Sequence, residues 1–313
     1  MLNFILKRIA LAIPTMLVIL AVVFWTARLT PADPVDIIAG EKASQATKDR
    51  MRHEYGLDQP VTTQFVHYVG GIVLHGDFGR AFVYRNRQPV RDMIIEDFPV
   101  TAQLALQALL FALVIGLPVG ILAALYHNSG FDKAAMTIVV ALVSVPSIVL
   151  GPIMVLAIAV RLHWLPVSGW DSPLHTILPT ITLGSRSAAL IARFMRGSLL
   201  EVLRQDYMRT AIAKGLSRGQ AVWRHALKNA FLPVLTILGT NFGLLLTGSF
   251  VVETIFRVPG IGRASYESII VHDYPVIQGM TLLVAMIFLA VNLAVDVLYG
   301  VIDPRVRTQG DAA

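Results

Sequence analysis

The sequence contains no cysteine, and only 15% of its 313 residues are Asp, Glu, Lys or Arg. Soluble domains carry roughly 25% charged residues. The missing cysteines exclude disulfides, thiolate catalysis and Cys-ligated metals. The scarcity of charge, together with a mean hydropathy of +0.66, excludes a single soluble core, because too little polar surface remains to cover it. The composition therefore predicts an all-α polytopic membrane protein.

Motifs for chemistry are also missing. The eight His residues show no H-E-x-x-H or other ligand spacing, so we expect no metal site. No G-x-x-x-x-G-K-[ST] loop occurs, so the chain is expected to hold no nucleotide. No nucleophile–base pair is visible by spacing. We therefore predict no catalytic residue, no cofactor in this chain and no enzymatic activity.

Six apolar stretches approach the roughly 20 residues that a membrane-spanning helix needs. The first is too long for the apolar region of a signal peptide and is interpreted as an uncleaved helix. Proline residues 14, 118, 146 and 152 are expected to be tolerated as kinks. The predicted spans are Ile9–Leu29, Val100–Tyr126, Ala134–Val160, Ile177–Phe194, Phe231–Phe256 and Met280–Ile302.

The distribution of basic residues predicts the orientation. With a cytoplasmic N-terminus, the inner segments hold most of the Lys and Arg of the short loops, and the outer loops hold Arg161, Arg257 and Arg263. This bias places both termini in the cytoplasm. The same bias explains the net charge of +6, because surplus Lys and Arg are kept on the cytoplasmic side of the membrane. We therefore expect contact with lipid and no nucleic-acid partner.

The expected organisation has four parts. Residues 1–29 form the N-terminus and first span, and 30–99 form an extracytoplasmic region. Residues 100–302 form the transmembrane part, and 303–313 a cytoplasmic tail. In the outer region, Ala46–Tyr55 and Val61–Leu74 have helical spacing, Gly76–Gly79 is a turn, and Val90–Phe98 is a short amphipathic stretch before Pro99. A small, partly helical outer cap is predicted.

The inner loop 195–230 is long for a connection in a compact protein. Apolar residues four apart predict a helix up to Gly215, and Ser217 with Gln220 fits a capping box that starts a second helix. The apolar faces need a surface, which part of the protein's own spans, a partner's groove or lipid headgroups could provide.

The segment Asp206–Leu216 resembles the EAA loop of ABC importer permeases, and more narrowly that of the peptide/nickel class, first-subunit type. The consensus Glu-Ala is replaced by Arg209 and Thr210, whereas Ala211 and Gly215 keep the pattern. The longer spacing to Leu232-Pro233 is also typical of the peptide class. Other similar segments are Gly56–Pro60, Gly76–Gly79, Val252–Gly262 and Asp273–Gly279.

This resemblance implies a permease of the bacterial inner membrane for peptide uptake. The implied partners are a homologous second permease, two ABC ATPase subunits that bind ATP and Mg, and an extracytoplasmic substrate-binding protein. The implied coupling residues are Arg209, Thr210, Ala211, Ala213, Lys214 and Gly215.

Polar residues inside the predicted spans are candidates for the pore or a gate, because such residues are costly in lipid. Each has an alternative role in structural pairing, helix bonding or snorkelling to an interface. The candidates are Arg186, Asn241, Asn292 and Asp296. A stand-alone ion-driven transporter is the alternative function, although neither inverted repeats nor midplane charges are clear.

Overall fold

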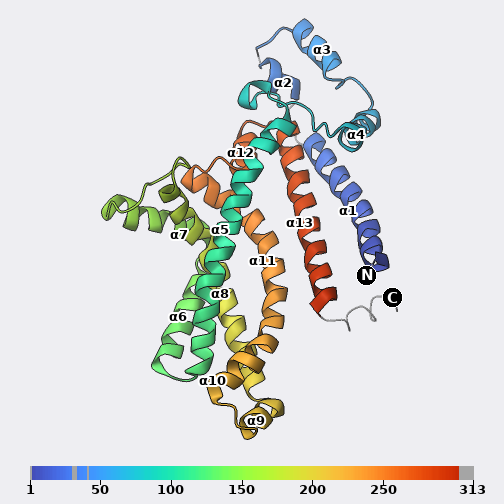
Figure 1. Ribbon diagram of the computed structural model, residues 1–313. Coiled ribbons are helices and arrows are strands. Elements are labelled where there is room, and N and C mark those ends of the chain that lie inside the picture. Colours follow the sequence, from blue (N-terminus) through green and yellow to red (C-terminus); the bar gives the residue numbers. More distant parts are fainter. Residues whose placement is uncertain (1, 30–33, 41, 303–313) are drawn as a thin grey trace. The chain divides into compact units, whose positions relative to one another are not determined.

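The computed structural model describes residues 2–29, 34–40 and 42–302, and Figure 1 shows that helices make up nearly all of the described chain. Within those ranges the isolated bridge between Arg80 and Pro89 is the sole strand-like pairing. The helices belong to two compact units, residues 102–258 and the described parts of 1–101 and 259–313. Helix α5 (Val90–Leu125) contributes to both. The all-α class predicted from composition is confirmed.

The first unit contains two long apolar helices, α1 and α13, which pack against each other (Figure 1). It also contains the short helices of the predicted cap and the first turns of α5. Helices α3 and α4 with η1 confirm the two helices expected from spacing in the outer region. The elements are α1 (Leu2–Leu29), α2 (Pro34–Ala39), α3 (Gln45–Glu54), α4 (Val61–Gly70), η1 (Gly71–His75), η2 (Tyr84–Arg87), α12 (Ile261–Ile270) and α13 (Tyr274–Ile302).

A buried carboxylate holds this unit together. Asp273, at the N-terminus of α13, is fully buried. Its oxygens accept hydrogen bonds from the backbone N–H groups of Phe82, Val83 and Tyr84 at 3.0, 2.8 and 2.9 Å. Because charge-assisted bonds offset the cost of burying a carboxylate, Asp273 fixes the segment before α5 against the start of α13.

The second unit is built around α8 and α11, which lie side by side (Figure 1). Gly116 and Gly120 of α5 permit a close approach to α8, since a Cβ built on either would lie 2.5 Å from the carbonyl oxygen of Ala188 or Ala192. The elements are α6 (Gly130–Ser144), α7 (Ser147–Met154), η3 (Val155–Arg161), α8 (Pro173–Leu203), α9 (Asp206–Ala213), α10 (Arg218–Ala221), η4 (Val222–Ala226) and α11 (Leu227–Phe256).

The third predicted span differs from the structure. The stretch Ala134–Val160 was expected to be one helix with a tolerated kink at Pro146, but α6 and the α7–η3 segment are bent by 107°. Val145 has an extended backbone, φ −85° and ψ 118°. Proline disfavours the helical region for the residue before it and donates no N–H bond, so α6 ends there. Pro14, Pro118 and Pro152 do remain inside helices.

The second predicted span begins earlier than expected. Val90–Phe98 is not a separate stretch, because α5 runs from Val90 through Pro99 to Leu125. By length and composition, α5 and residues Tyr274–Ala294 of α13 could each cross a membrane, and the bent pair could form a third span. The count of six spans stays a prediction.

Candidate functional site

The loop 195–230 is folded as helix, glycine turn and helix, as predicted. Helix α9 ends at Ala213, and Gly215 follows with a φ of +94°. This left-handed conformation is open to glycine at little cost and is strained for other residues. An added Cβ on Gly215 would meet nothing within 4 Å. Glycine is therefore favoured at this position by the backbone conformation and not by a lack of space for a side chain.

The second helix starts with the predicted capping box. The Oγ of Ser217 accepts a hydrogen bond from the backbone N–H of Gln220 at 3.3 Å. The side-chain oxygen of Gln220 accepts one from the backbone N–H of Ser217 at 3.1 Å. These two bonds satisfy N–H groups that a helix start leaves without partners. The direction in which α10 leaves the turn is fixed locally.

The inner face of α9 packs on the protein's own helices. Met208 is 3% exposed and lies in a core cluster with Leu199 of α8 and Ala230 of α11. Ala211 and Leu216 pack at the edge of the same cluster. The apolar face of α9 is thus covered by α8 and α11 of the same chain, and this packing fixes α9 in place.

The face of α9 that carries Asp206 and Arg209 is exposed, and so is Ile212, which lies one turn after the buried Met208. Ile212 is 48% exposed, and the pair Arg209–Asp206, with 3.7 Å between nitrogen and oxygen, is almost fully open to solvent. The predicted coupling residues are therefore divided: Ala211 is half-buried, and those exposed are Arg209, Thr210, Ala213, Lys214 and Gly215. This mixed basic and apolar surface suits contact with a protein groove or with lipid headgroups.

A buried ion pair, which the sequence analysis missed, fixes the part of α8 that leads into this loop. The carboxylate of Asp132 is 3% exposed and accepts bonds from Nε and Nη2 of Arg196 at 2.6 and 2.8 Å. These bonds lower the pKa of Asp132 to about 2. The pair joins the first turn of α6 to α8. Ser129 and Asp132 have the S-x-x-D spacing of a capping box, which is the signal that could have located the carboxylate.

The pore candidates lie in different surroundings. Arg186 is exposed on α8, and so is Arg193, which lies two turns later on the same helix and is not one of the four candidates. Asn241 is buried, and its Nδ2 donates to the carbonyl of Ile237 at 2.9 Å. Asn292 lies beside a groove of about 280 Å³ between α13 and α1. The side chain of Asp296 is outside the described residues. A pore role for these four candidates stays a prediction.

No metal centre can be assembled from the described parts of the chain. They contain no group of three or more His, Asp or Glu side chains placed to share an ion. The chemistry that the loop offers is contact through an exposed helical face held on a rigid base.

Comparison with known protein families gives two matches that together span nearly the whole chain. Residues 116–308 match the family described as binding-protein-dependent transport system inner membrane component. Residues 1–105 match the N-terminal region described for the membrane components of such systems. The first match alone includes the loop 195–230.

Curated relatives resemble the chain along its full length. The glutathione transport system permease protein GsiC of Escherichia coli (strain K12) is 44% identical over 307 residues, which is 98% of this chain and 99% of the relative. The protein of the same name from Salmonella choleraesuis (strain SC-B67) is also 44% identical over 307 residues, with the same coverage.

Solved structures share the fold. A chain from inward-facing conformations of the MetNI methionine ABC transporter matches with a TM-score of 0.59 and 20% identity, covering 67% of this chain and 96% of the other. A chain from an amino acid ABC transporter with histidines matches with a TM-score of 0.50 and 18% identity, covering 68% and 94%. At such identities the likeness describes the fold alone.

Proposed function

This chain belongs to the family of binding-protein-dependent transport system inner membrane components, and on that premise we propose that it carries peptide-type solutes inward, driven by separate ATPase subunits through α9. It is a permease of an ABC importer. Its full-length relatives do not favour the stand-alone ion-driven transporter. The observation that carries the proposed coupling is the exposed face of α9 on a buried base.

The substrate proposal rests on the relatives. Two glutathione permeases are 44% identical to this chain over nearly its whole length, and glutathione is itself a small peptide. Dipeptides, oligopeptides, glutathione and nickel complexes are the candidate substrates. Recognition of one of them is assigned mainly to the external binding protein.

The proposed assembly contains a homologous second permease, two ABC ATPases and an extracytoplasmic binding protein. ATP and Mg are bound by the ATPases. The exposed surfaces of Arg186 and Arg193 on α8 support a pathway completed by the second permease, because a charged side chain in a membrane normally faces a bundle interior or water. Asn241, Asn292 and Asp296 are proposed to act along the same pathway or gate.

The proposed topology has six spans with both termini in the cytoplasm of the cell. The length and apolar character of α5 and α13 support it, as does the concentration of Lys and Arg in the loop 195–230. Residues 30–99 then form the outer cap, and α9 faces the ATPases.

Coupling requires two conformations of similar energy that ATP binding shifts by differential contact. A flexible loop could not transmit such a difference. The buried Met208 and the Asp132–Arg196 pair fix α9 and the end of α8 to their helices, so movement of a bound ATPase would move α8 and α11 with it.

Cysteine cross-linking can test this proposal cleanly, because the native chain has no cysteine. In the assembled transporter, Ala213→Cys on the exposed face is expected to cross-link to an ATPase subunit through a short bifunctional reagent. Ala226→Cys, on a fully buried alanine of the same loop, is the matched control and should remain unlinked. Labelling of Ala213→Cys by lipid-borne reagents alone would overturn the coupling role.

A further inference from the structure

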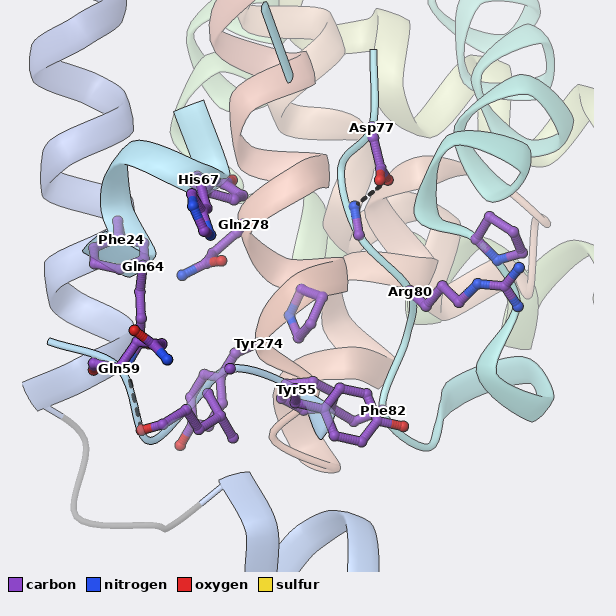
Figure 2. A pocket seen from close by; sticks show the side chains of 16 residues that line it. Phe24, Tyr55, Gln59, Gln64, His67, Asp77, Arg80, Phe82, Tyr274 and Gln278 are labelled. Atoms are coloured by element: carbon purple, nitrogen blue, oxygen red, sulfur yellow. Dashed lines mark hydrogen bonds between the residues drawn. The ribbon is translucent and has the colours of Figure 1, made fainter. Parts of the chain in front are cut away.

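A cavity of the first unit lies among the short helices of the cap. Its volume is about 570 Å³, within the range of roughly 300–1,000 Å³ for small-molecule sites. Figure 2 shows side chains around it from α1, α4 and α13, from the turn after α3 and from the segment before α5. Nothing in the proposed coupling mechanism uses this cavity.

Three residues that line the cavity each have a buried polar atom, closed off from the cavity space, with no hydrogen-bond partner among the described residues. These atoms are the hydroxyls of Tyr68 and Tyr274 and the Nε2 of Gln278. Tyr274 and Gln278 are 5% and 6% exposed. Buried polar groups in native proteins are nearly always bonded, so three such groups at one cavity indicate a polar ligand. Burial raises the pKa of Tyr68, so its hydroxyl keeps a proton to donate.

The rest of the wall is aromatic. Phe24 lies 5.8 Å from Tyr68, and Tyr55 lies 5.7 Å from Phe82, between ring centroids. These rings suit the apolar side chains of a ligand and exclude water from its polar groups. A fatty acyl chain would leave the three polar atoms unpaired, which disfavours a purely apolar ligand.

The cavity also has one charge of each sign. Asp77 and Arg80 lie together at one side of the view in Figure 2, and His67 and Gln278 lie at the other. The Oδ1 of Asp77 accepts a bond from the backbone N–H of Gly79 at 2.8 Å. Arg80 is exposed and has no ion pair within the described ranges. One cation and one carboxylate suit a zwitterion better than a multiply charged anion.

From this geometry we propose that the cavity is a binding site for a short zwitterionic peptide. Its carboxylate lies at Arg80, and its amide groups bond to Gln278, Tyr274 and Tyr68 after small rotations of these side chains toward the cavity. The inference rests on the proposed function only for the placement of residues 30–99 outside the cytoplasm. It adds a site on the permease itself, distinct from the external binding protein.

The test measures binding of radiolabelled tri-alanine to the purified full chain in lipid nanodiscs. Gln278→Leu and Tyr274→Phe each remove one unpartnered atom and should each weaken binding by about fivefold. The matched controls are Gln88→Leu and Tyr126→Phe, which lie outside the cavity and should leave binding unchanged. Tri-alanine amide should bind native protein more weakly than tri-alanine, and Arg80→Gln should abolish that difference.

A second readout separates a ligand role from a structural one. Without peptide, Gln278→Leu and Tyr274→Phe should unfold at the same or a higher temperature than native protein, because each removes a buried polar atom that has no partner. Lower unfolding temperatures, no binding of tri-alanine, or equal binding by native protein and both variants would overturn the proposal. These measurements need neither ATP nor ATPases, so they fail or succeed independently of the Ala213→Cys cross-link.

Discussion

Asp132 and Arg196, which are 64 residues apart in sequence, form a two-pronged ion pair at 2.6 and 2.8 Å, and the Asp132 carboxylate is buried. The pair fastens the first turn of α6 to the part of α8 that leads into α9. His127 lies within 3.3 Å of the same carboxylate. The base of the proposed coupling element thus depends on residues outside the loop 195–230 as well as inside it.

Removal of the cation should destabilise the second unit. Arg196→Met leaves the Asp132 carboxylate buried with fewer donors, and the expected loss is about 2 kcal/mol at neutral pH. Thermal unfolding of the full chain in detergent measures it. Arg193→Met, at an exposed arginine one turn earlier, is the control and should change stability little. Equal unfolding temperatures for both variants would contradict a stabilising role of the pair.

The same pair should make stability depend on acid. The pKa of Asp132 is lowered from 3.8 to about 2 by its bonds to Arg196. A carboxyl group with a lowered folded-state pKa stabilises the fold above its unfolded-state pKa, and this contribution is lost between about pH 4 and pH 2. The difference in free energy of unfolding between native protein and Arg196→Met should therefore become smaller as the pH falls through this range. A difference that stays constant would rule out this linkage.

The turn after α9 should tolerate no side chain. Gly215→Ala places a Cβ on a backbone with φ +94° and should cost about 1–2 kcal/mol, or shift α9 to relieve the strain. ATP hydrolysis by the assembled transporter should then continue with reduced uptake. Gly219→Ala, within α10 and with open space around its Cβ, is the control. Normal uptake by a well-assembled Gly215→Ala transporter would count against the role of α9.

Close packing between α5 and α8 should be equally sensitive to one methyl group. A Cβ on Gly116 would lie 2.5 Å from the carbonyl oxygen of Ala188. Gly116→Ala should therefore force the helices apart and destabilise the unit by roughly 1–3 kcal/mol. Gly197→Ala in α8, with nothing within 4 Å, should be neutral or slightly stabilising. Chemical denaturation of both variants compares them.

The features that sequence predicted best are those encoded locally. Helix α9, the glycine turn and the Ser217–Gln220 capping box each depend on residues within a few positions of one another. The periodicity also predicted the two cap helices. The same local reading assigned Ala211 to the contact surface without showing that it packs inward, because periodicity does not say which face a partner covers.

The features that the sequence did not predict depend on contacts between distant residues, or on whether a proline stays inside a helix or ends it. Pro99 and Pro14 lie inside helices, whereas Pro146 ends one. Surrounding packing decides among these outcomes. Asp132 and Asp273 find partners 64 and about 190 residues away, and a single sequence contains no signal for such pairings. The three unpartnered atoms of the cap cavity became visible only once their surroundings were known.

The hydrogen bonds from residues 82–84 to Asp273 determine which substitutions this segment can accept. Among the described residues the Asp273 carboxylate bonds only to backbone N–H groups, which every amino acid except proline provides. Val83, nearly half exposed, could be exchanged for most other residues while the anchorage persists. The side chains that this segment presents to solvent can thus change while its backbone stays in place. A single proline there, or a change at Asp273 itself, would release it.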